Sequence, residues 1–316
     1  MTEYIFTSNE MMTADQLAIK NGISSQSLMR NAGEAVLKNL PLDHNGIVLI
    51  ICGPGNNGGD GYVVAGLLSN LGVTVEVVSL EFGKIPSKDN QFYKNKLDQL
   101  IFKKKPSDLS NYEYVVDALF GMGLSRNLSD EINDLINDIN SADLDVYSID
   151  VPTGINSDTG EVHGTAFKSK KTVTFFNKKL CHYLLPGRQY CGEIVVEDIG
   201  ISKNVIKKIM PKIKKNEPSL WIDQFPFPLS SDHKYSRGML VINTGPKYQT
   251  GAARLAGRSA LRVGAGAVTM VCDEETAEIL EPQISVELIS VIKEKNDFQM
   301  LLKDKRVSSV LIGPGN

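Results

Sequence analysis

The 316-residue sequence contains only four cysteines, and no two of them have the C-x-x-C spacing of a metal or redox motif. This low density excludes a small disulfide-stabilised fold and is typical of a reducing compartment. Basic residues do not outnumber acidic ones, since the formal net charge is -3. The sequence therefore has no overall positive charge to attract nucleic acid or an anionic membrane, and we expect neither as a partner.

Long apolar runs are also absent. No uninterrupted apolar segment is long enough to span a bilayer, and the N-terminus lacks a basic region followed by an apolar core. We therefore expect a cytoplasmic protein without a membrane-spanning helix. Its length, with 42% hydrophobic and 22% charged residues, suggests about two globular domains.

Three common catalytic motifs are missing. The sequence has no G-x-x-x-x-G-K-[ST] loop, no G-x-S-x-G turn and no H-E-x-x-H zinc motif. These absences make nucleophilic hydrolysis and zinc catalysis poor interpretations. The histidines show no ligand spacing either: they are His44, His163, His182 and His233.

Apolar runs that alternate with amphipathic segments predict the fold. Two helical patterns, at 13–22 and 24–40, precede the first strand. From there the alternation is typical of a doubly wound parallel sheet, a Rossmann-like α/β fold. The expected strands are 47–52, 73–79, 114–119, 144–149, 172–176 and 193–200, and the expected helices are 62–71, 91–100, 130–139 and 202–213.

Residues 214–232 combine charge, proline and serine without periodicity, which predicts a linker. We therefore expect a first domain at 1–213 and a second at 233–316. The second domain is predicted to be an α/β fold that stops partway, with about three strands in a parallel sheet. Its expected strands are 239–245, 267–272 and 307–313, with one helix at 250–266 and another before the last strand.

The segment Gly53–Gly66, "GPGNNGGDGYVVAG", follows the first expected strand. Gly53, Gly55 and Gly58 satisfy G-x-G-x-x-G, and Glu81 lies at about the distance of an acid that binds a ribose hydroxyl. This pattern alone is typical of an NAD(P)-dependent oxidoreductase. The same loop carries polar side chains that a plain phosphate-binding turn does not need: Asn56, Asn57 and Asp60.

Carboxylates lie at the ends of two other expected strands. Asp117 precedes the segment Gly121–Asn127, and Asp150 precedes "VPTG". Because the carboxyl ends of parallel strands meet at one edge of the sheet, we expect a ligand site there. Asn57, Asp117 and the hydroxyl of Thr153 offer the amide, carboxylate and hydroxyl oxygens that hard cations prefer.

Each of these features also has a structural interpretation. Glycine and asparagine are common in turns because they tolerate positive φ. Asp60 would cap the following helix, Asp150 would stabilise a loop, and Lys178 and Lys179 would lie on a solvated surface. The functional interpretation is favoured because three separate strand ends combine glycine with a carboxylate.

Five segments follow one another in this order over roughly residues 10–210: "MTADQLAIKNGISSQSLMRNAGEAV", "GPGNNGGDGYVVA", "VVDALFGMGLSRNLS", "SIDVPTGINSDTGEVHG" and "TVTFFNKKLCHYLLPG". Together they resemble the NAD(P)H-hydrate epimerase family. The part from Gly238 to Asn316 resembles the opening of a ribokinase-like NAD(P)H-hydrate dehydratase, so the two parts together resemble a bifunctional nicotinamide-nucleotide repair enzyme. Ribokinase-like enzymes place their catalytic Asp in the later half, so the resemblance implies that dehydratase activity is absent here.

The resemblance implies an isomerase that interconverts the R and S forms of hydrated NADH or NADPH. It also implies potassium as cofactor, bound by Asn57, Asp117 and Thr153. The family usually has serine where Thr153 stands and threonine where Met122 stands, so only Met122 loses a hydroxyl. The implied substrate-binding residues are Asn56, Asn57, Gly58, Gly59, Asp60, Gly121, Met122, Gly123, Leu124, Ser125, Arg126, Asn127 and Asp150.

Asp150 is the expected catalytic residue, as acid and base, because a carboxyl group within reach of the C6 hydroxyl of the hydrate can protonate its departure. Two other functions stay open, an NAD(P)-dependent oxidoreductase and a non-catalytic nucleotide-binding module. The sequence does not decide between NADH and NADPH hydrates, and it is compatible with a homo-oligomer.

Overall fold

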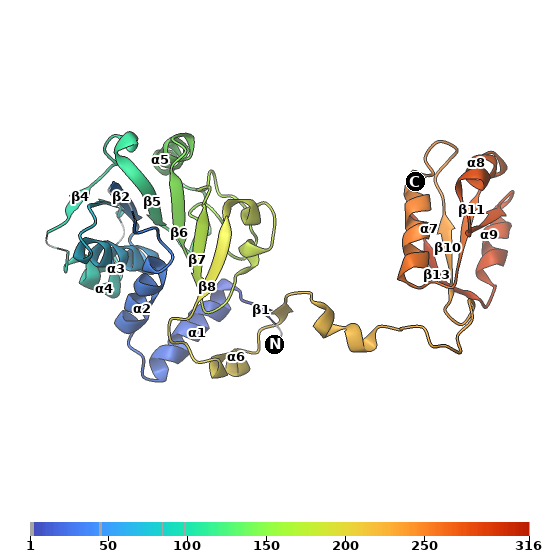
Figure 1. Ribbon diagram of the computed structural model, residues 1–316, viewed down its shortest axis with the longest axis horizontal. Helices are drawn as coiled ribbons and strands as arrows, with labels where there is room; N and C mark the ends of the chain where they lie inside the picture. Colours follow the sequence, from blue (N-terminus) through green and yellow to red (C-terminus); the bar gives the residue numbers. More distant parts are fainter. Residues whose placement is uncertain (1–2, 44–45, 84, 98, 316) are drawn as a thin grey trace. The chain divides into compact units, whose positions relative to one another are not determined.

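The computed structural model describes residues 3–43, 46–83, 85–97 and 99–315. The chain forms two compact units, residues 1–220 and residues 221–316, and each contains a parallel sheet (Figure 1). The division falls inside the segment that was predicted to be a linker. Within the described part of the chain, no helix combines the length and the apolar character that crossing a membrane requires.

The first unit has a seven-stranded parallel sheet in the order β4-β3-β2-β5-β6-β7-β8, which confirms the predicted fold class. The short edge strand β4 was not predicted. The strands are β2 (Ile47–Cys52), β3 (Val75–Ser79), β4 (Ile101–Lys103), β5 (Tyr112–Ala118), β6 (Asp145–Ile149), β7 (Lys171–Phe175) and β8 (Glu193–Glu197).

Helices cover both faces of this sheet. Val48 and Ile50 of β2 pack with residues of α1, α2, α3 and α6, whereas Leu49 and Ile51 pack with α5. Successive residues of a strand point to opposite faces, so a strand covered on both sides has a continuous apolar run. The helices are α1 (Ser8–Lys20), α2 (Ser25–Leu37), α3 (Asn56–Asn70), α4 (Lys88–Lys94), α5 (Asp130–Ser141) and α6 (Asn204–Ile209).

Helix α1 begins at Ser8, five residues before the predicted start. Thr7 and Glu10 form a capping box, in which each side chain accepts a hydrogen bond from the other residue's backbone N–H. Before this helix, β1 (Tyr4–Ile5) pairs antiparallel with β9 (Ile213–Lys214). The N-terminal segment and the end of the first unit therefore lie side by side.

Helix α3 also begins earlier than predicted, at Asn56, so the glycine-rich sequence itself forms the first helical turns. Gly55 is its N-cap and has φ −85°, which any residue can adopt. Gly58 lies against the turn after β2, where a Cβ atom would come within 1.9 Å of the Gly53 carbonyl oxygen. Asp60 is inside the helix, so the interpretation of Asp60 as a helix cap is wrong.

The second unit has a four-stranded parallel sheet in the order β12-β11-β10-β13. The sequence predicted about three strands and missed β12, because a single helix was expected between β11 and β13. A short helix, β12 and a second helix occupy this region instead. The elements are β10 (Met239–Asn243), α7 (Gly251–Val263), β11 (Ala267–Cys272), α8 (Glu274–Leu280), β12 (Leu288–Val291), α9 (Lys295–Leu302) and β13 (Val307–Leu311).

The close approach at Gly58 predicts that alanine substitution destabilises the protein more at Gly58 than at Gly55, in the same turn. Gly58→Ala should lower the free energy of unfolding of the first unit by about 1–3 kcal/mol or more, because the new methyl group meets backbone. Gly55→Ala is the matched control, since a Cβ there would meet nothing within 4 Å. Urea denaturation followed by circular dichroism measures both, and equal stability of the two variants would contradict the packing argument.

Candidate functional site

A cavity of ≈ 770 Å³ lies at the carboxyl ends of the central strands of the first unit. The strand order changes direction here, because the chain continues from β2 to β3 on one side and reaches β5 and β6 on the other. Such a switch point is where open α/β sheets bind ligands. Residues of α1 and α2 line the other walls.

Asp150 and Lys179 form a buried ion pair in the cavity wall. The Lys179 ammonium has 0% exposure, and its nitrogen lies 2.5 Å from Asp150 Oδ1. It also donates to Thr174 Oγ1 at 2.7 Å and to the Phe175 carbonyl at 3.2 Å. All three N–H groups thus have acceptors, which offsets the cost of burying the charge. The expectation that Lys179 lies on a solvated surface is wrong.

Asp150 is held in a strained backbone conformation with φ 66°. Its backbone N–H donates to the Val173 carbonyl at 2.7 Å, and its side-chain Oδ1 accepts from Thr174 Oγ1 at 2.9 Å. The second carboxylate oxygen, Oδ2, accepts no hydrogen bond from the described residues. Asp150 therefore presents one free carboxylate oxygen on a fixed side chain that lines the cavity.

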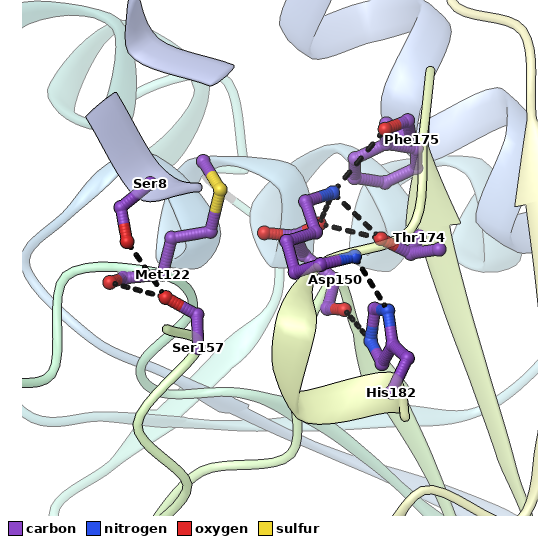
Figure 2. Close-up of polar contacts among 8 residues, drawn as sticks. Ser8, Met122, Asp150, Ser157, Thr174, Phe175 and His182 are labelled. Carbon is purple, nitrogen blue, oxygen red and sulfur yellow. Dashed lines mark hydrogen bonds and ion pairs between the residues drawn. The ribbon is translucent and has the colours of Figure 1, made fainter. Parts of the chain in front are cut away.

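His182 supports this arrangement from behind. Its Nδ1 accepts from the backbone N–H of Lys179 at 3.0 Å, so the proton is on Nε2, which donates to the Asp150 carbonyl at 3.2 Å (Figure 2). Burial, together with the nearby Lys179 charge, lowers the pKa of His182 to about 4. The imidazole is therefore neutral, and its two hydrogen bonds connect the loop after β7 to the backbone of Asp150.

Two more carboxyl groups line the cavity, Asp15 from α1 and Asp60 from α3. Burial raises the pKa of Asp15 to about 6, with a contribution from the Asp150 charge. Burial, followed by the charges of Asp150 and Asp15, raises the pKa of Asp60 well above its usual value. Sequence reasoning included Asp60 but missed Asp15. The available signal was the helical pattern, since Asp15 follows the buried Ala14 on the inward side of α1.

Asp117 and Thr153 lie together, and neither is part of the cavity lining. The Asp117 carboxylate is fully buried and accepts four hydrogen bonds, from Ser148 Oγ, the backbone N–H groups of Leu119 and Thr153, and Thr153 Oγ1. Burial raises its pKa to about 6 although these hydrogen bonds oppose the change. Thr153 Oγ1 also lies 3.2 Å from the Phe120 carbonyl, which is a second acceptor for its proton.

Asn57 comes to the same region from α3. Its amide lies against Gly121, where a Cβ would come within 3.0 Å of Asn57 Oδ1. Its Nδ2 is buried and has no hydrogen-bond partner among the described residues. A buried unpaired amide is costly, and the two ends of an amide are interchangeable in shape. With the amide turned over, an oxygen would take the place of the unpaired nitrogen.

The segment after β5 contributes Gly121, Met122, Gly123, Leu124 and Ser125 to the cavity. Ser157 Oγ donates to the Met122 carbonyl at 3.2 Å and lies 2.8 Å from Ser8 Oγ at the start of α1 (Figure 2). This chain of hydroxyl groups connects α1 to the segment after β5. Asn56, Asn57 and Asp60 also line the cavity, whereas the remaining predicted contacts are not part of its lining: Gly58, Gly59, Arg126 and Asn127.

Other predicted ligands lie elsewhere. Glu81 pairs with Lys94 at 2.7 Å and is not part of the cavity lining, so the dinucleotide-type acid is not brought to the site. His44 lies outside the described residues. Across the described ranges, no group of three or more His, Cys, Asp or Glu side chains could hold a metal ion.

Two family models match the sequence. The model described as "YjeF-related protein N-terminus" matches residues 25–181, and the one described as "NAD(P)H-hydrate dehydratase" matches residues 239–315.

Curated relatives cover either the first unit or most of the chain. An NAD(P)H-hydrate epimerase of Oenococcus oeni is 37% identical over 207 residues, which are 64% of this chain and 99% of that protein. A bifunctional NAD(P)H-hydrate repair enzyme of Coxiella burnetii is 34% identical over 98% of this chain. The chain spans 64% of the length of that bifunctional relative and 55% of one from Dictyoglomus turgidum.

A solved structure has the same fold. The crystal structure of yeast ynu0, YNL200c, matches 67% of this chain and 96% of its own, with a TM-score of 0.56 and 20% sequence identity. At this identity the match supports the architecture of the first unit only.

The buried imidazole of His182 predicts a pH dependence of stability. Its folded-state pKa of about 4 lies below the ordinary value of 6.5, so the stability that it contributes is complete above pH 6.5 and is lost as the pH falls toward 4. The contribution is roughly 3 kcal/mol. His182→Asn should therefore lose less stability than the wild type between pH 6.5 and 4 in urea titrations.

The exposed His233→Asn is the matched control for this measurement and should follow the wild type. A His182→Asn variant that also followed the wild-type pH dependence would show that folding does not lower the pKa of His182.

Proposed function

The chain belongs to the NAD(P)H-hydrate epimerase family, and on this premise we propose that it interconverts the R and S forms of hydrated NADH and NADPH. The family membership that the motifs predicted is confirmed by the epimerase relatives that it covers almost completely. The observation that carries the proposal is the fixed Asp150 carboxylate, with its free oxygen in a cavity at the strand switch point. The volume of ≈ 770 Å³ lies in the range of small-molecule and cofactor sites.

The start of α3 is suited to the pyrophosphate of a dinucleotide. A helix N-terminus carries free N–H groups and partial positive charge, and Asn56 and Asn57 of the first turn line the cavity. The family resemblance also implies substrate contacts of Gly58 and Gly59, which are not part of the cavity lining, and a side chain at either position would collide with Gly53 or Met29. The segment Gly121–Asn127 would contact the substrate from the other side, as the family resemblance implies.

The reaction requires proton transfer at one carbon atom. In the hydrate, the C6 hydroxyl is next to the ring nitrogen. Protonation of the hydroxyl lets water leave with the C–O electron pair while the nitrogen lone pair forms an iminium ion. Water then adds to the opposite face of C6 and loses a proton. We assign acid–base catalysis to Asp150, whose Oδ1 is held by Lys179 and Thr174 while Oδ2 stays available.

The residues Asn57, Asp117 and Thr153 fit a potassium ion. They offer buried amide, carboxylate and hydroxyl oxygens, and the unpaired Asn57 amide marks a polar position without a partner in the described chain. If the Thr153 hydroxyl donates to the Phe120 carbonyl, oxygens of both Thr153 and Asp117 become available. The ion would balance the charge of Asp117 and fix the segments that follow β5 and β6.

Competing functions explain fewer of these features. An oxidoreductase would use Glu81 at the ribose, but Glu81 pairs with Lys94. A non-catalytic nucleotide-binding module would not require a strained, ion-paired carboxylate beside the cavity. The four cysteines are all free thiols, which suits action in the cytoplasm.

The second unit carries a separate expectation. Its resemblance to a dehydratase covers residues 239–315, and Gly251–Ala253 would correspond to the start of that active site. The 316-residue polypeptide contains no counterpart of the later half with the catalytic Asp. We therefore propose that this polypeptide epimerises hydrates but does not dehydrate them.

Incubation with purified R and S hydrates, followed by chromatography, tests the proposal. The polypeptide should equilibrate the two forms and should yield no NADH or NADPH when ADP or ATP is added. Asp150→Asn should slow epimerisation by about 10²- to 10⁴-fold while still binding the hydrate, because the amide keeps the shape but transfers no proton. Wild-type rates in this variant would remove Asp150 from catalysis, and no interconversion by the wild type would remove the proposed function.

Potassium titration of activity tests the cation site. Asp117→Asn should weaken the potassium response and lower turnover, because one charged oxygen ligand is lost without a change of shape. Thr153→Ser is the matched control, since it keeps the hydroxyl and should keep the response. A potassium response that is unchanged in Asp117→Asn would place the cation elsewhere.

A further inference from the structure

Epimerisation needs proton transfer on both faces of the ring. The hydroxyl leaves one face with a proton from an acid, and the incoming water gives a proton to a base on the other face. Asp150 is poorly suited to both tasks, because Lys179 and Thr174 hold its side chain in one orientation. The reaction under the proposed function therefore calls for a second group that exchanges protons with the substrate.

Asp60 has the properties of such a group. It lines the same cavity as Asp150 from the second turn of α3, and it accepts no hydrogen bond and forms no ion pair with any described residue. The buried ammonium of Lys179 cannot serve it, because all three N–H groups are already used. Its carboxyl group is thus available to a ligand and has no partner that stabilises a negative charge.

We propose that Asp60 is the second catalytic residue of the epimerase, a carboxylic acid that keeps its proton because Asp15 and Asp150 surround the same cavity, and that Asp150 is the base. This proposal rests on the function proposed above. It assigns proton transfer to a residue for which the sequence implied only substrate binding.

The groups around Asp60 support the assignment. The carboxyl groups of Asp15 on α1 and Asp150 after β6 face it, and both raise its pKa in addition to burial. The Cys52 thiol on β2 and the Tyr93 hydroxyl on α4 also lie within electrostatic reach, and burial raises the pKa of each, so both are neutral near pH 7. Asp15 and Asp60 both lack a hydrogen-bond donor among the described residues, but the Lys179 charge opposes the rise in the pKa of Asp15, whereas no cation opposes it for Asp60.

The steps balance with these two groups. Asp60 gives its proton to the C6 hydroxyl, the C6–O bond breaks with its electron pair on the departing water, and the ring nitrogen forms the iminium ion. Water then attacks the opposite face of C6, the iminium electrons return to nitrogen, and Asp150 Oδ2 accepts the proton that this water loses. In the reverse direction, Asp150 is the acid and Asp60 the base, as microscopic reversibility requires.

Asp60→Asn is the first test, with rates for the R and S hydrates measured across pH. We expect kcat to fall by about 10²- to 10⁴-fold with KM little changed, and we expect the alkaline decline of kcat/KM to disappear from the residual activity. A variant with altered KM and unchanged kcat would reduce Asp60 to a binding residue. Wild-type kinetics would overturn the proposal.

Asp15→Asn tests whether the Asp15 charge raises the pKa of Asp60. The measurement is the pH at which kcat/KM declines, which a purely structural role of Asp15 would not change. Removing one charge that raises the pKa of Asp60 should shift the alkaline decline of kcat/KM to lower pH. Asp89→Asn is the matched control, because Asp89 lines the same cavity but is not among the charges that raise the pKa of Asp60, and it should leave the decline in place. An unmoved decline in Asp15→Asn would remove Asp15 from the proposal.

Infrared spectroscopy tests the protonation state without turnover. At pH 7 the wild type should show a carboxylic acid C=O band that is absent from Asp60→Asn and still present in Asp89→Asn. An identical band in wild type and Asp60→Asn would overturn the proposal even if the variant were inactive through misfolding. If the wild type shows the Asp60 band but no epimerisation, the proposed function fails while the protonated carboxyl stands, so the two failures are distinguishable.

Discussion

The buried ammonium of Lys179 is the constraint on which the rest of the site depends. A lysine without contact to water requires an acceptor for each N–H group and a nearby negative charge. The end of β7 supplies the Thr174 hydroxyl and the Phe175 carbonyl, and β6 supplies the Asp150 carboxylate. The left-handed backbone of Asp150 follows from this need, because the side chain must turn back toward β7. The contacts that offset the cost of burying Lys179 are thus the same contacts that hold the Asp150 carboxylate in place.

The remaining polar groups of the cavity respond to that ion pair. Since Asp150 takes the only buried ammonium among the described residues that line the cavity, Asp15 and Asp60 are left without a cation. Burial raises both pKa values, whereas burial and the charge of the same lysine lower that of His182. Burial therefore favours the protonated form of Asp60 and the neutral form of His182.

The sequence predicted the sheet and the strand ends, because apolar runs and glycine–carboxylate pairs are local patterns. Nine of the thirteen substrate-binding residues that the family resemblance implied line the cavity. The sequence could not predict Lys179, since a lysine in "NKKL" becomes buried only when β6 and the N-terminal segment pack against it. The early start of α1 depended on the capping box of Thr7, which no apolar periodicity shows. The helical pattern placed Asp15 next to the buried face of α1, but it could not show that Asp150 and Lys179, more than a hundred residues later in the chain, lie near it.

The pairing of β1 with β9 has a consequence for the order in which the protein forms during synthesis. Phe6 bridges to Lys179, and Tyr4 and Ile5 pair with Lys214 and Ile213. Residues 4–6 therefore leave the ribosome well before their partners, which are made about two hundred residues later, and contacts of such high separation form slowly. Until then, the lysine that organises the cavity lacks its cover. The same pairing brings the two ends of the first unit together. Domains with adjacent ends tolerate circular permutation, in which the old termini are joined and new ones are opened in a surface loop.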